Sequence, residues 1–268
     1  MKKTLENLYQ GYNKYEFLHP DPLEFLHGYS DLRDREVVGI IASSLAYGRV
    51  EQIIKSVSWV LDQMDPYPLR FLELSSDRSL KSAFTGFKHR FTTGDELVSM
   101  LSGIKRVIQR YGSLQEAFVQ GLNHSDDTIM PALTVFVDQL RDNTDGRYNS
   151  LLPCPAKGSA LKRLNLFLRW MVRKDDVDPG GWTNVPADKL IVPLDTHMHR
   201  ISLALGLTKR KQADMKTAME ITRAFKKIVP DDPVRYDFAL TRFGILRMEF
   251  PLEECLGQGD TYHGEVYN

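Results

Sequence analysis

Residues 193–207, PLDTHMHRISLALGL, decide the local fold because they place Asp195, His197 and His199 at every second position. In a β-strand those three side chains would share one face and could bind one metal ion together. After Thr196, however, the apolar residues recur at the three- and four-residue spacing of an α-helix, and a glycine follows where a helix would end. The pattern therefore favours a helix with Asp195 or Thr196 as its N-cap, in which residues two apart do not face each other.

A metal site remains the alternative interpretation of this stretch. A metal-dependent hydrolase would use Asp195, His197 and His199, and it would need further ligands from elsewhere because a helix separates the two histidines. We predict neither a bound metal nor a cofactor. The simplest role of Asp195 is that of an N-cap, whose carboxylate accepts hydrogen bonds from free backbone N–H groups.

The rest of the chain also follows helical spacing. Apolar residues recur at three- and four-residue intervals over 53–64, 97–108, 130–140 and 161–171, and runs that alternate apolar with polar residues are almost absent. The predicted fold class is therefore all-α, with about ten to twelve helices at the usual helix length.

Several helix starts are marked by capping residues. Thr93 stands three residues before Glu96, and Ser113 has the same relation to Glu116, which is the spacing of a capping box. Ser159 is expected to cap the helix over 161–171. Asp232 followed by Pro233 is expected to begin the last helix.

Composition limits the function without naming it. The formal net charge is zero, which does not favour a generic nucleic-acid binder, and no apolar run approaches the length that crosses a membrane. Cys154 and Cys255 are too few for a four-cysteine zinc site or iron–sulfur cluster. No apolar leader follows the first lysines, so we expect a cytoplasmic protein. We predict no obligate protein partner.

A basic segment lies between two irregular stretches, 142–158 and 175–189, both rich in Gly, Pro, Asn and Asp. Such a charge run is either a solvated helix face or a phosphate-binding surface. Its cations, with no acid between them, are Lys157, Lys162, Arg163, Arg169, Arg173 and Lys174.

The helix-entry stretch also resembles a known element. The sequence over 192–207 is similar to the VDTH-x-x-R-hydrophobic-x-x-x-LGL element of the helix-hairpin-helix base-excision DNA glycosylases. Bifunctional members of that superfamily carry a lysine at the start of the helix after the hairpin, where this chain has Lys162. The whole chain also looks like an uncharacterised bacterial family grouped near the archaeal 8-oxoguanine glycosylases. The matching residues of the element are Asp195, Thr196, His197, Arg200, Leu205, Gly206 and Leu207.

This chain departs from the superfamily pattern at three places. The Gly-x-Gly hairpin turn is replaced by CPAKG over 154–158, and the four-cysteine cluster is absent from the sequence. The glutamine that fills the gap in DNA has no obvious counterpart, so Tyr47 or Arg49 would substitute for it.

The resemblance implies a single two-lobed domain over 1–268, with one helical lobe over 36–150 and a second lobe formed by 1–35 and 151–268. It implies a glycosylase that removes a damaged base, an oxidised purine, from duplex DNA, and that is nucleoid-associated when it acts. A non-catalytic protein that binds nucleic-acid structures on the same scaffold is the alternative.

The implied site follows from the chemistry of base removal. Lys162 would attack C1′ of the sugar, and Asp195 would stabilise the positive charge that develops there. A base turned out of the duplex would stack on Trp182 or Trp170. The residues implied for DNA contact are Lys157, Gly158, Arg163, Arg169, Arg173, Lys174, His197, Tyr47 and Arg49.

Overall fold

The computed structural model describes residues 1–141, 148–246 and 250–251. Helices dominate this part of the chain, which confirms the all-α class; the one sheet in it is a two-stranded antiparallel hairpin of β1 (Lys88–His89) and β2 (Thr92–Thr93). The α-helices are α1 Lys2–Tyr12, α2 Leu32–Ser44, α3 Val50–Asp62, α4 Pro68–Leu74, α5 Asp77–Ala83, α6 Gly94–Tyr111, α7 Leu114–Val119, α8 Met130–Arg141, α9 Lys162–Val172, α10 Thr196–Ala204, α11 Met215–Ile228 and α12 Asp237–Ile245. Short 3-10 turns are η1 Tyr15–Phe17, η2 Pro22–Gly28, η3 Pro155–Lys157 and η4 Ala187–Lys189.

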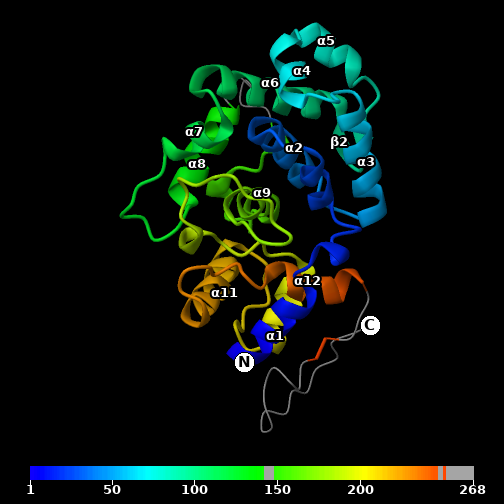
Figure 1. The fold of residues 1–268 in the computed structure, drawn as a ribbon. Coiled ribbons are helices and arrows are strands. Elements are labelled where there is room, and N and C mark those ends of the chain that lie inside the picture. Colours follow the sequence, from blue (N-terminus) through cyan, green and yellow to red (C-terminus); the bar gives the residue numbers. More distant parts are fainter. Residues whose placement is uncertain (142–147, 247–249, 252–268) are drawn as a thin grey trace.

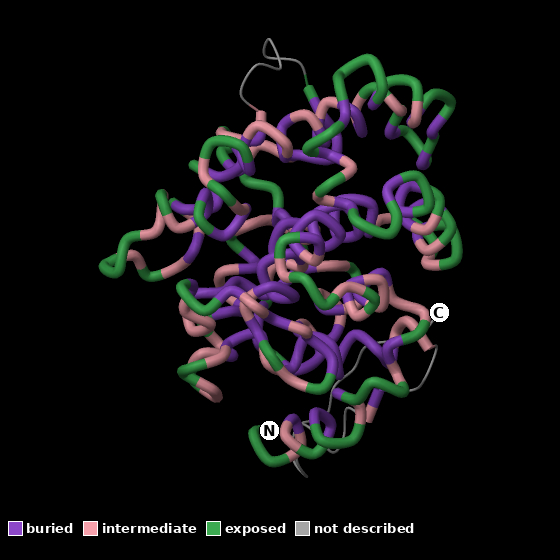
Figure 2. Tube along the Cα trace, turned by 45° about the horizontal axis from the view of Figure 1, so that its top comes forward, coloured by how far each residue is buried: buried purple, intermediate pink, exposed green. Residues whose placement is uncertain are grey.

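Helix α9 lies at the middle of the molecule (Figure 1). Helices α2 to α8 lie on one side of it, and α1, α11 and α12 lie on the other. Contacts join α2 to α9, α6 to α8, α1 to α12 and α10 to α12. Figure 2 shows the buried residues concentrated toward this centre, with exposed residues on the outer turns. The division into two lobes at the expected boundaries stays a prediction.

Close packing of α2 against α9 forms the centre of the core. Most of α2 is buried, and its N-cap Asp31 accepts from the N–H groups of Arg33 and Asp34. Gly39 faces α9, where a Cβ would lie 3.3 Å from side-chain atoms of both Phe167 and Met171. The missing side chain therefore lets the two helices approach closely, which places the end of α2 beside the start of α9.

The helix periods and two predicted caps are confirmed. Helices α3, α6, α8 and α9 lie over the four periodic segments and leave out only residues 63, 64 and 161. Thr93 and Glu96 form the expected capping box at α6, and Ser113 accepts from the N–H of Glu116 at α7.

Two other predicted caps are wrong. Ser159 does not cap α9, because Leu161 precedes that helix in a left-handed conformation (φ 49°) and Ser159 instead forms an isolated β-bridge with Asp214. Asp232 does not begin the last helix, because a turn follows it and α12 begins only at Asp237. Cys255, one of the two cysteines that are too few for a cysteine-ligated cluster, lies outside the described residues.

Arg169 and Arg173 are not surface cations, which corrects the expectation that they bind DNA. Their side chains are only 3% and 4% exposed and point into the interior. Arg169 pairs with Asp178 at 3.0 Å and with Asp237 at the start of α12. This cluster joins α9 to the segment after it and to α12. The partners of Arg173 are Asp175, Asp178 and Asp232.

Candidate functional site

A cavity of about 690 Å³ opens where distant segments of the chain meet. Its walls are the start of η2, the connection between α2 and α3, the first turns of α9 and α10, and α12. Its volume lies in the range of small-molecule sites. The residues that line it and carry charge or a titratable ring are Asp21, Arg49, Glu51, Lys162, Arg169, Asp195, His197, Asp237 and Arg242.

Lys162 is the first residue of α9 and reaches this cavity from the helix start. The left-handed turn at Leu161 redirects the chain just before the helix, so the lysine is placed at the entrance of α9. Its Nζ donates to the backbone oxygen of Ala46 at 3.1 Å. Among the described residues no carboxylate lies within ion-pair distance of Nζ, so the amine is held by one carbonyl at the cavity wall.

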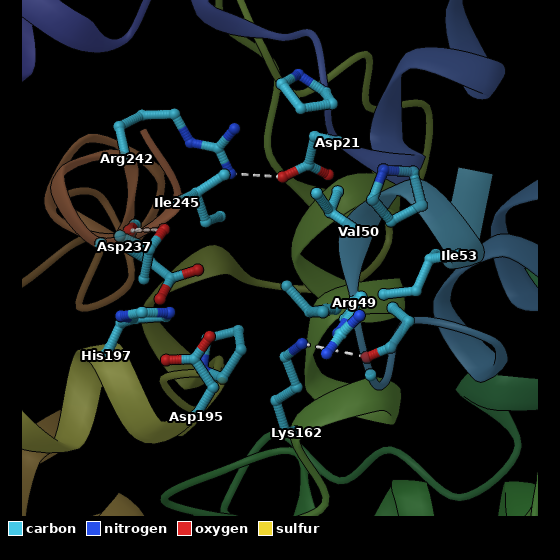
Figure 3. Close-up of a pocket in the computed structure, with 18 of the residues that line it drawn as sticks. Asp21, Arg49, Val50, Ile53, Lys162, Asp195, His197, Asp237, Arg242 and Ile245 are labelled. Carbon is cyan, nitrogen blue, oxygen red and sulfur yellow. Dashed lines mark hydrogen bonds and ion pairs between the residues drawn. The ribbon is translucent and has the colours of Figure 1, made fainter. Parts of the chain in front are cut away.

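Asp195 is the N-cap of α10, as the helical pattern predicted. One carboxylate oxygen accepts from the N–H of Met198 at 2.8 Å, and the positive end of the helix favours a negative charge there. Figure 3 shows Asp195 on one side of the cavity and Lys162 on the other. The fold therefore brings the two predicted catalytic residues to one cavity.

The two histidines of α10 point to different surroundings. The Nε2 atom of His199 lies 2.8 Å from the carbonyl oxygen of Arg210, within hydrogen-bond distance. His197 instead lines the cavity. His197 packs on α12 at Gly244, where a Cβ would lie 2.0 Å from Nδ1. The described part of the chain holds no group of three histidine, cysteine or acidic side chains placed for a metal ion. The Asp195–His197–His199 ligand set is therefore not formed.

A second cavity of about 490 Å³ shares Lys162, Asp195 and His197 with the first. Its own walls include Tyr47 and the segment from Ser159 to Arg163. The guanidinium of Arg163 lies 4.9 Å from the Tyr47 ring centre and donates to the carbonyls of Ser44 and Ser150. Arg163 thus holds the end of α2 against α9 and is only partly available to a ligand.

The other expected DNA-contact residues are more exposed. Lys157 and Gly158 are exposed in the turn before α9, with Gly158 in the left-handed region (φ 74°), and Arg49 is exposed at the cavity edge. Lys174 is exposed but follows the far end of α9, a helix about 16 Å long at the usual helical rise that begins at Lys162. Lys174 lines neither of these two cavities.

An aromatic group beside the second cavity was missed in the sequence. Phe91, in the turn between β1 and β2, is 62% exposed and stacks on Tyr47 with ring centres 5.0 Å apart. The Tyr47 hydroxyl donates to the His89 carbonyl at 2.9 Å. Arg90 packs against Gly48, whose φ of 98° suits glycine. No motif marked this turn, because its position beside Tyr47 depends on tertiary packing.

Trp182 and Trp170 do not line a base pocket, which corrects that expectation. Each is 1% exposed and neither borders the two cavities. Trp182 packs edge-on against Phe167 and donates from Nε1 to the buried carboxylate of Glu36 at 2.7 Å. Tyr47 and His197 are the aromatic rings that border the cavities.

Asp237 and the ion pair of Arg242 with Asp21 are cavity residues that the sequence did not single out. Asp237 is 3% exposed at the first position of α12. Burial raises the pKa of its carboxyl group to about 6, against the opposing effect of Arg169. A carboxyl group with such a pKa exchanges its proton close to neutral pH.

The fold and the site define an all-α protein with a polar, charged cavity. A family described as a protein of unknown function (DUF2400) matches residues 21–246, and the chain belongs to this family. Comparisons with curated proteins and with solved structures gave no match. No helix in the described part of the chain is both long and apolar enough to cross a membrane.

Proposed function

We propose that this protein is a DNA repair glycosylase with lyase chemistry, in which Lys162 is the nucleophile and Asp195 the stabilising carboxylate. The observation that carries the proposal is that these two residues, far apart in sequence, line the same two adjoining cavities. An amine held by a single carbonyl and a carboxylate held at a helix N-terminus are the two groups that the reaction requires.

The chemistry follows from the position of the two groups. The neutral amine of Lys162 attacks C1′, and the damaged base leaves with the electron pair of the glycosidic bond. Asp195 stabilises the positive charge that develops on the sugar. The adduct opens to a Schiff base between Nζ and C1′, which permits cleavage of the strand and can be reduced by borohydride.

The surface beside the cavities supports DNA as the partner. Lys157 and Arg49 are exposed cations that can contact phosphates, and Tyr47 with Phe91 offers an aromatic stack next to the opening. Tyr47 and His197 take the place that was expected for the two tryptophans as rings against an extruded base. The resemblance to a family near the archaeal 8-oxoguanine glycosylases supports a duplex with an oxidised purine as the proposed substrate.

The test is borohydride trapping on duplexes that carry an oxidised purine or an abasic site. Wild-type protein is expected to give a covalent complex, and Lys162→Gln none. Asp195→Asn is expected to lose most of the turnover while its α10 cap is retained, because Asn also caps helices. Lys227→Gln changes an exposed lysine on α11 and serves as the control with wild-type trapping.

Two results would overturn the proposal. In the first, the wild-type protein neither cleaves nor is trapped on any duplex of the panel. In the second, it binds these duplexes with an affinity that Asp195→Asn does not change and never turns over. The second result would establish a non-catalytic binding protein on this scaffold.

A further inference from the structure

Asp237 is a buried carboxyl group at the wall of the larger cavity. Figure 3 shows Asp237 with His197 and Asp195 on one side of that cavity, and Lys162 on the opposite side. Helix α12 begins at Asp237, so the residue is anchored to the element that closes this side of the site.

The two oxygens of Asp237 have different surroundings. Oδ2 accepts from Arg169, whereas Oδ1 is buried and has no hydrogen-bond partner among the described residues. A buried carboxylate oxygen without a partner costs free energy, and a proton on that oxygen lowers the cost because the neutral group needs less solvation. A protonated Oδ1 is also a donor with no acceptor supplied by the described protein groups.

Burial favours a proton on Asp237, and two neighbouring carboxylates add to this effect while Arg169 opposes it. Burial is the largest cause that raises the pKa of Asp237 to about 6; Arg169 lowers it, and the negative charges of Asp195 and Asp178 raise it further. Asp195 is the carboxylate that the proposed reaction needs in its charged form. The charged or titratable groups that line this cavity or act on Asp237 include Lys162 and Arg169 on α9, Asp195 and His197 on α10, Asp178 after α9, Arg242 on α12 and Asp21 before η2.

We propose that Asp237 is a second catalytic residue, the general acid that protonates the departing base. This inference rests on the proposed function of the same cavity. The C1′–N bond breaks with its electron pair on the base, the lone pair of Lys162 forms the new C1′–N bond, and the base takes the proton from Oδ1 of Asp237. One proton of the adduct nitrogen then passes through water to the Asp237 carboxylate, which restores the acid.

The proposal predicts that loss of the acid affects two substrates differently, although both react with the same lysine. A duplex with a damaged base needs a proton on the leaving group, whereas an abasic site has no base to expel. General acid catalysis contributes about 100-fold or more to rate. Asp237→Asn is therefore expected to slow base removal in single turnover by about that factor, while borohydride trapping on the abasic duplex continues at the wild-type rate.

The pH profile gives a second, independent measurement on the wild-type protein. Base removal should decline as pH rises through the pKa of Asp237, about 6, because the acid form is lost. Trapping on the abasic duplex should lack this decline. Asp237→Glu keeps a carboxylic acid and should recover part of the base-removal rate with its pH dependence. The wild-type pH profiles and the Asp237→Glu variant test the proposal even if Asp237→Asn fails to fold.

Asp188→Asn is the control. It neutralises a carboxylate that is 40% exposed and pairs with Lys226 on α11, and Asp188 does not line either cavity. It should keep the wild-type ratio of rates on the two substrates.

The inference is overturned if Asp237→Asn leaves base removal unchanged, if it slows both substrates equally, or if the two wild-type pH profiles coincide. Failure of the underlying function is a different result, namely that wild-type protein is not trapped even on the abasic duplex.

Discussion

Replacement of Arg169 by methionine tests whether the basic face of α9 is structural. The guanidinium is 3% exposed and neutralises two buried carboxylates, Asp178 at 3.0 Å and Asp237. Removal of one partner of a buried ion pair typically costs about 3–5 kcal/mol, because the other charge stays buried without compensation. Asp178 keeps its ion pair with Arg173, whereas Asp237 loses its ion-pair partner, so most of the cost falls on Asp237. We therefore expect a loss near the lower end, about 3 kcal/mol.

The assay is equilibrium unfolding by urea, with thermal unfolding as a second probe. For a protein of this size about 3 kcal/mol corresponds to a decrease in Tm of roughly 6–12 °C. The control is Arg33→Met, because the Arg33–Glu73 pair is 3.5 Å long and about half exposed on both sides. Such a surface pair contributes about 0–1 kcal/mol.

Two outcomes would refute this account of Arg169. One is an Arg169→Met variant as stable as the Arg33→Met control. The other is a stable Arg169→Met variant that has lost affinity for DNA, which would return the residue to the DNA-contact surface expected from the sequence.

Three further predictions concern the cavity. Gly244→Ala places a methyl group 2.0 Å from the present position of His197 Nδ1, so it should shift that ring and lower turnover. Gly11→Ala is the control and should leave turnover unchanged, because a Cβ there has open space around it. Single-turnover rates of both variants test this prediction. Asp195→Ala should lower the free energy of unfolding by about 0.5–2 kcal/mol through loss of the cap, and Asp195→Asn by less, which urea titration measures. The raised pKa of Asp237 favours the neutral group in the folded state, so its contribution to stability is complete below about pH 4 and is lost as pH rises through about 6. The urea midpoint of Asp237→Asn should therefore increase relative to wild type between pH 4 and 7, and a parallel pH dependence of the two proteins would contradict this.

Local signals predicted the elements that carry the site. Helix α10 and its cap at Asp195 were predictable because a cap and an apolar period are encoded within a few residues. Lys162 was expected in the first turn of α9 from the cap predicted at Ser159 and from the resemblance, and it is the first residue of that helix. That Lys162 lines the same cavity as Asp195 was expected only from the resemblance, because tertiary packing brings the two segments to that cavity.

Residues with distant partners could not be predicted in the same way. Arg169 has the charge of a DNA-contact residue, but its partner Asp237 lies 68 positions away and turns it inward. Trp182 was expected at the site because it follows two glycines in a long loop, and its burial depends on Glu36, 146 positions away. Ser159 has a capping side chain, yet the left-handed turn at Leu161 begins the helix later. No local motif marks Asp237, since its burial depends on the packing of α12 against Arg169 of α9.

The most direct test of the central claim is to map the borohydride crosslink by mass spectrometry. Wild-type protein is incubated with an abasic duplex, reduced, digested and compared with the unreduced sample. The account predicts that the sugar remnant is attached to the peptide that contains Lys162 and to no other lysine. Attachment at Lys157 instead, or no crosslinked peptide at all, would contradict it.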